Sequence, residues 1–150
     1  MAAPIVSGLN TLLLSASTTP TPDIVALAAT LNNDGIVNIP GAAGTGIFSV
    51  ATVNVMASGQ ITTSADTGTA NLPVNILLCQ TNPSTGACLG APSGLVTTQI
   101  NAGQTPTFGI FVQGGGTLVP FDPANNRAFV RFKDAAGVTR SSTSVAVRTQ

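Results

Sequence analysis

The sequence contains no histidine, tryptophan, tyrosine or glutamate, so all five of its acidic residues are aspartates. Histidine is the commonest general base and the commonest transition-metal ligand in proteins. Its absence excludes Ser-His-Asp and Cys-His catalytic arrangements and histidine-containing zinc or copper sites. Because no other catalytic motif is present, we expect a protein that is not an enzyme and that needs no cofactor or metal.

Charge is also scarce: charged residues make up 7% of the 150 residues, against about 25% in a typical soluble domain. Hydrophobic residues make up 43%, which favours a packed core over disorder. No apolar run approaches the roughly 20 residues that cross a bilayer, so we expect no membrane insertion. The net charge is zero, and aromatic residues interleave with the cations no further than Phe129, so nucleic acid is not an expected partner.

The few charges are unevenly distributed along the chain. Residues 1–120 hold three aspartates and no cation, whereas residues 121–150 hold all five cations and two aspartates. One interpretation is that the basic part attracts the acidic part of a neighbouring copy. The other is that the cations are solvated charges that discourage aggregation between sheet edges. The cations that we regard as candidates for assembly are Arg131, Lys133, Arg140 and Arg148.

The two cysteines, Cys79 and Cys88, enclose eight residues. The segment between them contains Asn-Pro-Ser-Thr-Gly, which is strong turn chemistry, so the flanks should run antiparallel and bring the thiols together. We predict a disulfide, which indicates an oxidising compartment and contributes about 2–3 kcal/mol for a loop of this length. The alternative is a pair of buried thiols.

Short strand signals separated by turns recur along the whole chain. Residues 23–31 fit a short helix capped by Asp23 or a strand; we favour a strand that forms a hairpin with residues 36–40 through the Asn-Asn-Asp-Gly turn. Residues 60–65 are polar and resemble an edge strand. The remaining predicted strands are 47–57, 72–80, 95–100, 107–113, 118–121, 128–133 and 142–148.

The last two predicted strands alternate clearly between apolar and polar positions and are joined by a turn at residues 134–137. Ala128, Val130 and Phe132 share one face of the first strand, and Val145 and Val147 share one face of the second. Such alternation is typical of strands with one buried and one wet face. We therefore predict an antiparallel hairpin at the closing edge of a β-sandwich.

The same hairpin carries a family resemblance. The motif Asn-Arg-x-Phe-Val-Arg-Phe-x-Asp-x-x-Gly at residues 126–137, followed by Ser-Thr-Ser-Val-Ala-Val at 142–147, resembles the last two strands of immunoglobulin-like modules that are repeated in large bacterial surface and secreted proteins. The resemblance is clearest over residues 106–150. It implies an all-β, antiparallel immunoglobulin-like β-sandwich at the bacterial cell surface or outside the cell, and it includes no catalytic signature.

The N-terminal part differs in composition from the rest. Residues 5–17 form an apolar segment of strand-like length, and the Thr/Pro stretch up to Pro22 is typical of an extended spacer. We therefore divide the chain into an N-terminal strand and spacer, residues 1–22, and a β-sandwich, residues 23–150. The segment is either the first strand of its own sandwich or an arm that adds as a strand to a neighbouring copy. The arm would use Ile5, Val6, Leu9, Leu12, Leu13 and Leu14.

Two loops, at residues 32–34 and 122–126, offer the oxygen ligands that Ca²⁺ requires. Neither loop has the density of carboxylates of a good calcium site, and both are more easily explained as turns that Asp and Asn side chains stabilise. Whether calcium binds is left open by the sequence.

The function that these features favour is a non-enzymatic extracellular structural module. It would be a subunit of a self-assembling surface filament or layer, or one repeat of an adhesin-like chain, with other copies or neighbouring repeats as its partners. One alternative is a module that binds a surface glycan or another partner, although tryptophan and tyrosine, the usual sugar-stacking residues, are absent. The other alternative is a phage or coat decoration protein.

Overall fold

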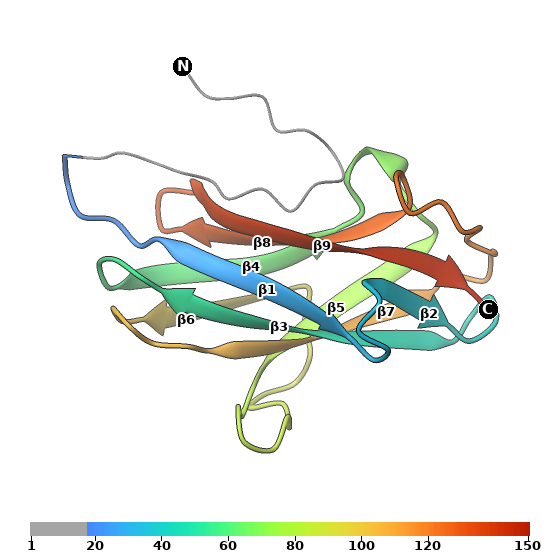
Figure 1. Cartoon of the computed structure of the whole chain (residues 1–150), viewed down its shortest axis with the longest axis horizontal. Helices are drawn as coiled ribbons and strands as arrows, with labels where there is room; N and C mark the ends of the chain where they lie inside the picture. The colour runs from blue at the N-terminus through green and yellow to red at the C-terminus, as the bar shows by residue number, and fades with distance from the viewer. Residues whose placement is uncertain (1–17) are drawn as a thin grey trace.

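Nine strands and one short 3-10 helix make up the regular structure of residues 18–150, the part of the chain that the computed structural model describes (Figure 1). The 3-10 helix η1 is Gly68–Ala70. The strands are β1 (Ile24–Thr30), β2 (Ile36–Ile39), β3 (Thr45–Asn54), β4 (Gly59–Asp66), β5 (Val74–Thr81), β6 (Leu95–Ile100), β7 (Thr107–Gly114), β8 (Arg127–Asp134) and β9 (Thr139–Thr149).

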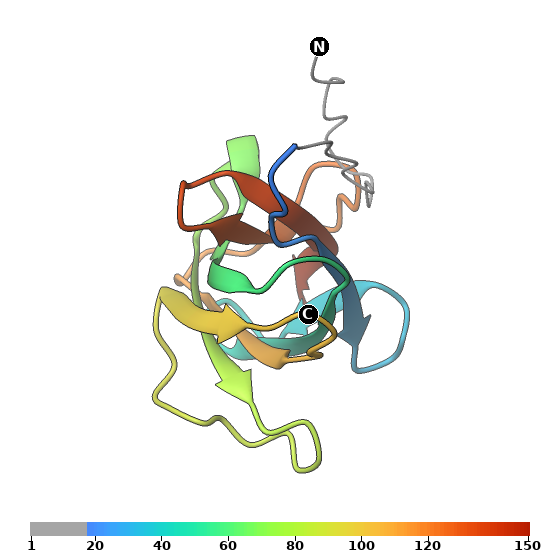
Figure 2. The ribbon, with the colours of Figure 1, turned by 90° about the vertical axis from the view of Figure 1, so that its left-hand side faces the viewer.

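The strands form two facing sheets, seen end-on in Figure 2. One sheet has the order β1-β3-β7-β5 and the other β2-β9-β8-β4-β6. All neighbours are antiparallel except β2 and β9, which are parallel. An immunoglobulin fold has one sheet with the strand order A-B-E-D and a second with the order G-F-C. Here β1-β3-β7-β5 follows the first order, and β9-β8-β4 follows the second. The predicted all-β immunoglobulin-like β-sandwich is therefore confirmed.

Two strands are additional to that arrangement. Strand β2 pairs parallel with β9 at one edge of the five-stranded sheet, and strand β6, which follows β5 in the chain, lies beside β4 at the other edge. The seven strands A to G are all present between Ile24 and Thr149 without them. The sandwich core is therefore complete within these strands and has no missing position that a strand from elsewhere would have to fill.

Strict alternation along β3 shows how the sequence makes this core. Phe48, Val50 and Asn54 are buried between the sheets, whereas Ile47 and Ser49 point outward. The strand predicted at residues 107–113 is confirmed as β7, on which Phe108, Ile110 and Val112 are buried. The rings of Phe108 and Phe132 meet edge to face with centroids 5.6 Å apart. Each fully buried aliphatic or aromatic side chain stabilises the fold by about 1.5–3 kcal/mol.

The C-terminal hairpin is confirmed, but its predicted position is wrong. Strands β8 and β9 pair antiparallel, and Val130, Phe132, Val145 and Val147 are buried as expected. The hairpin lies in the middle of its sheet, because β2 pairs with β9 and β4 pairs with β8. The local pattern of the hairpin contains no information about these partners, which come from distant parts of the chain.

Three other predictions about strands are corrected. β1 and β2 do not form a hairpin, because they belong to different sheets. The turn between them is held by the hydroxyl of Thr30, which accepts the N–H groups of Asp34 and Gly35, and it directs the chain from one sheet to the other. Strand β4 is interior and not an edge, since it lies between β8 and β6. Residues 118–121 form no strand, although Val119 is buried and exchanges hydrogen bonds with Thr149.

The buried side chain of Asn54 joins the two sheets where the first strand begins. Its Nδ2 donates to the carbonyls of Ala57 (2.8 Å) and Ile100 (3.0 Å). Its Oδ1 accepts the N–H groups of Asp23 (3.1 Å) and Met56 (3.2 Å). All four hydrogen-bonding positions of the amide are therefore used, and the entry to β1 is tied to the end of β3 and to β6 of the opposite sheet.

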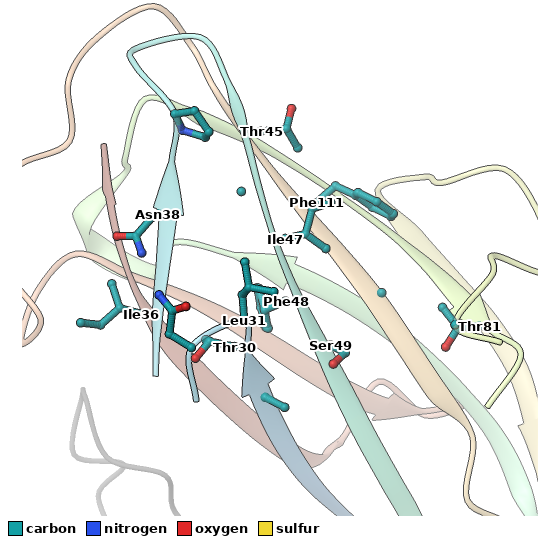
Figure 3. A pocket seen from close by; sticks show the side chains of 16 residues that line it. Thr30, Leu31, Ile36, Asn38, Thr45, Ile47, Phe48, Ser49, Thr81 and Phe111 are labelled. Carbon is teal, nitrogen blue, oxygen red and sulfur yellow. The ribbon is translucent and has the colours of Figure 1, made fainter. Parts of the chain in front are cut away.

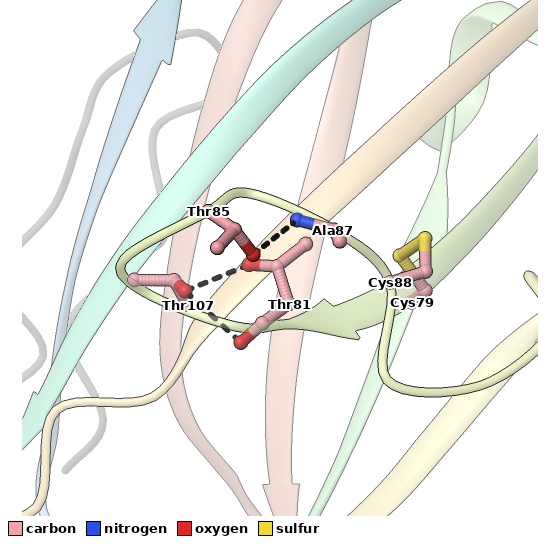
Figure 4. The surroundings of a disulfide bond; sticks show 6 residues. All are labelled: Cys79, Thr81, Thr85, Ala87, Cys88 and Thr107. Carbon is pink, nitrogen blue, oxygen red and sulfur yellow. Dashed lines mark hydrogen bonds between the residues drawn. A yellow bond between two sulfur atoms is a disulfide. The ribbon is translucent and has the colours of Figure 1, made fainter.

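The predicted disulfide between Cys79 and Cys88 is confirmed, with 5.6 Å between the Cα atoms (Figure 4). The enclosed turn is stabilised by the hydrogen bond from the N–H of Ala87 to Oγ1 of Thr85. The chain after Cys88 runs along the outer edge of β5: Leu78 and Ser93 exchange two backbone hydrogen bonds, and Leu89 donates one to Gln80. This segment covers the edge of β5.

Replacing Asn54 with alanine should reduce the free energy of unfolding by about 2–3 kcal/mol, because buried backbone groups lose their partners. Urea unfolding followed by circular dichroism measures this change. The matched control is Asn75→Ala, an exposed asparagine on β5, which should stay within about 0.5 kcal/mol of the unmodified chain. Equal stabilities of the two variants would contradict the role given to Asn54.

Replacing both cysteines with serine should reduce the free energy of unfolding by about 2–3 kcal/mol and leave the β-sheet circular dichroism spectrum unchanged. The bond closes a local loop and does not join the two sheets. Reducing agent should lower the stability of the unmodified chain by a similar amount and have no effect on the double variant. Complete unfolding on reduction would contradict this local role.

Candidate assembly surface

Charged residues are concentrated on one of the two sheets. The strands β1, β3, β5 and β7, which form the four-stranded sheet, contain no charged residue. The strands of the five-stranded sheet contain seven of the ten charged residues of the chain, namely Asp66, Arg127, Arg131, Lys133, Asp134, Arg140 and Arg148. The charge asymmetry along the sequence thus becomes a difference between the two faces of the sandwich.

Arg131, a predicted assembly cation, forms an ion pair within the molecule. Its Nε and Nη2 donate to the two carboxylate oxygens of Asp66 at 2.6 and 3.1 Å, and its guanidinium lies 5.0 Å from the ring centroid of Phe129. Burial of Asp66 disfavours its ionised form. The hydrogen bonds from Arg131 and the N–H of Gly68, together with the charges of Arg131 and Lys133, nevertheless hold the pKa of this carboxyl below its ordinary value.

Two further predicted assembly cations also have partners within the molecule. Arg140 donates from Nε to the carboxylate of Asp134 at 2.7 Å. Arg148 donates from Nε to Oδ1 of Asn38 at 2.7 Å and lies 5.0 Å from the ring centroid of Phe121. These contacts fix the side chains on the five-stranded sheet. That Arg131, Lys133, Arg140 and Arg148 attract neighbouring copies stays a prediction.

The outer surface of the four-stranded sheet is uncharged and largely apolar, and we call it the uncharged face. Several large apolar side chains project from this sheet into solvent: Val25 is 41% exposed, Leu27 69% and Ile47 55%. Contiguous exposed apolar surface of this kind marks interaction sites on soluble proteins. The outward-facing positions of this sheet, among which Cys79, Thr81 and Gly109 are buried, are Val25, Leu27, Ala29, Thr45, Ile47, Ser49, Ala51, Val53, Asn75, Leu77, Cys79, Thr81, Thr107, Gly109, Phe111 and Gln113.

A groove of about 680 Å³ lies across part of the uncharged face (Figure 3). Ala29, Ser49 and Gly109 are paired across β1, β3 and β7 and form a row of small residues at its floor. A Cβ atom at Gly109 would lie 3.3 Å from Cγ2 of Thr81, so glycine keeps this floor low. Ile47 and Phe111, paired in the next row, add apolar side chains.

The two sides of the groove come from segments far apart in the sequence. On one side are Leu31 and Asn32, which follow β1, with Ile36, Asn38 and Pro40 of β2 and the loop after it. On the other are Thr81, at the end of β5, and Gly86, in the loop that the disulfide closes. Oγ1 of Thr81 is 2.7 Å from Oγ1 of Thr107 (Figure 4). The disulfide therefore also holds one side of the groove.

Pro22 and Asp23 lead into the four-stranded sheet at the end opposite to the groove. The buried ring of Pro22 packs against Gly59, and the N–H of the next residue, Asp23, bonds to Asn54. The groove begins further along β1, at Ala29. The predicted arm residues Ile5, Val6, Leu9, Leu12, Leu13 and Leu14 lie outside the described residues.

The two loops considered for calcium are turns in which the carboxylates bond to their own backbone. Asp34 accepts the N–H of Ile36 at 2.9 Å. Asp122 accepts the N–H and the side-chain amide of Asn125 at 3.2 and 2.9 Å. Between residues 18 and 150, no three acidic or cysteine residues come together as a metal-binding group. No helix of this part of the chain is long and apolar enough to span a membrane.

Neither a protein-family model nor a curated protein matches the chain. Distantly similar solved structures include β-glucosidases from Listeria innocua (10% identity, 86% of this chain and 16% of that chain, TM-score 0.39) and Erythrobacter marinus (12%, 85% and 15%, 0.37). Another is a non-cellulosomal cohesin from the archaeon Archaeoglobus fulgidus (14%, 85% and 86%, 0.33). The chain spans only a small part of each β-glucosidase. At this level of similarity no family or activity follows, and the fold assignment rests on the strand order.

Proposed function

We propose that this chain is a non-enzymatic structural module of an extracellular assembly and that it associates through the uncharged face. The observation that carries the proposal is the division of the sandwich into one sheet with charged strands and one without. Association through the uncharged face removes apolar side chains from water without stripping water from any charge. The assembly would be a surface filament or layer, or a row of repeats in an adhesin-like chain.

The charges of the five-stranded sheet also favour contacts through the uncharged face. The ion pair of Arg131 with Asp66 is partly exposed and contributes little to stability. The charges of this sheet leave that side of the sandwich hydrated, and like charges on neighbouring copies disfavour its association. Contacts between copies are thereby directed to the other sheet.

The inventory of acidic groups supports a role without catalysis. The chain has no histidine or glutamate, so aspartates are its only carboxylate side chains. Asp66 and Asp134 are paired with arginines, and Asp34 and Asp122 bond within their turns. None of these four lies on the uncharged face or in its groove. The disulfide supports an extracellular location, because such bonds persist in oxidising compartments.

The uncharged face alone is too small to form a stable specific interface. Four strands about 4.8 Å apart and about eight residues long, at about 3.3 Å per residue, give an area on the order of 500 Å². A stable specific interface buries about 800 Å² from each partner. Flat contact through this face therefore supplies only part of a stable interface, and we expect another element of the chain to add to it.

Replacing Ile47 with lysine should weaken self-association at least tenfold, because the contact would then bury an unpaired charge. Size-exclusion chromatography with light scattering over a range of concentrations measures the effect. The matched control is Leu95→Lys, on the outer side of β6 in the five-stranded sheet. Leu95 is 57% exposed, against 55% for Ile47, and its replacement should leave association unchanged.

Both lysine variants should keep the stability of the unmodified chain within about 0.5 kcal/mol, since both positions are exposed. An unmodified chain that stays monomeric at every concentration would overturn the proposal. Equal loss of association in the two variants would also count against the uncharged face as the contact surface.

A further inference from the structure

We infer that the groove on the uncharged face binds the apolar N-terminal segment, residues 5–15, of a neighbouring copy, so that copies join head to tail. This inference rests on the proposed function and names the element that completes the contact. It also replaces pairing at a strand edge with docking on the face of a sheet.

The chemistry of the segment matches that of the groove. Residues 5–15 contain no charged residue and six large aliphatic ones: Ile5, Val6, Leu9, Leu12, Leu13 and Leu14. The groove is also uncharged, with the apolar side chains of Ile47 and Phe111 beside a low floor. Its volume of about 680 Å³ lies within the roughly 300–1,000 Å³ of typical ligand pockets. It therefore accommodates a few side chains, such as the three consecutive leucines.

One of the two edges of the four-stranded sheet is closed to an incoming strand. The edge of β5 is covered by the chain after Cys88, through the hydrogen bonds of Leu78 with Ser93 and of Gln80 with Leu89. Strand β1 forms the other edge. No core position is missing, because all seven immunoglobulin strands lie between Ile24 and Thr149. The groove crosses the strands and needs no free edge.

The position of the segment favours a neighbour's groove over its own. The chain enters β1 at the pair Ile24 and Asn54, whereas the groove begins at the pair Ala29 and Ser49. Five residues of strand separate the two places by about 17 Å. Pro22 is anchored on Gly59 at the entry, and the Thr/Pro composition before it favours an extended path. An extended spacer from this anchor favours the groove of a neighbour over the groove of the same copy.

A contact between the N-terminal segment of one copy and the groove of its neighbour is heterologous. Such a contact uses different surfaces on the two partners and repeats from copy to copy unless it closes into a ring. The buried area also increases beyond that of the flat face, because the segment is enclosed on two sides. The expected product is an unbranched filament.

Two complementary variants test this arrangement. The first lacks residues 2–17 and keeps the groove. The second is Ser49→Lys, which keeps the segment but places a charge on the groove floor. Each variant alone should be monomeric by size-exclusion chromatography with light scattering, and an equimolar mixture should form a dimer of the two that grows no further. The unmodified chain should form longer species.

A third variant separates the groove from the rest of the face. Val25→Lys adds the same charge to the uncharged face at an exposed position outside the groove. Because Val25 lies on the face but outside the groove, this lysine should weaken association much less than Ser49→Lys, which should bind the arm at least tenfold more weakly. Equal effects of the two lysines would overturn docking in the groove.

Other outcomes distinguish failure of the inference from failure of the proposed function. If the variant lacking residues 2–17 still associates with itself, two uncharged faces pack directly; the inference is then wrong and the proposed function stands. If the unmodified chain associates but the mixture stays monomeric, the inference is likewise wrong. If the unmodified chain is monomeric, the proposed function fails and the inference fails with it.

Discussion

The side-chain amide of Asn54 closes the end of the sandwich at which the N-terminal segment enters. Its four hydrogen bonds join the backbone before β1, the turn after β3 and the last residue of β6. Because one buried amide connects both sheets, it fixes where the chain before Ile24 leaves the molecule. The two ends of the four-stranded sheet differ as a result: one receives the N-terminal segment, and the groove extends toward the other.

Alternation within each strand gives this sandwich two outer surfaces of different character. On β3 the inward residues Phe48 and Val50 build the core, while the outward residues Ile47, Ser49 and Ala51 belong to the uncharged face. The five-stranded sheet instead carries the arginine and aspartate side chains. Hydration of the charged sheet and removal of the other sheet's apolar surface from water both favour contacts through the uncharged face. The same period-two pattern thus accounts for the fold and for the uncharged face through which we propose that copies associate.

The sequence predicts what depends on neighbouring residues. The faces of β3, β7, β8 and β9 follow from alternation, and the disulfide follows from the turn between its cysteines. What it does not predict is which strands pair across long separations. The parallel contact of β2 with β9 and the interior position of β4 have no local signal. The sequence does not predict the uncharged face for the same reason, because its four strands are recognised as one surface only when their order in the sheet is known. The sequence does show that each of these strands lacks charged residues.

Negative-stain electron microscopy of the unmodified chain, at a series of concentrations, tests the central claim most directly. The claim is that sandwiches associate through the uncharged face with different surfaces on the two partners, which produces a contact that repeats. We predict unbranched filaments that lengthen with concentration. Uniform particles of a single sandwich at the highest concentration would contradict self-assembly, and particles made of two sandwiches only would contradict a repeating head-to-tail contact.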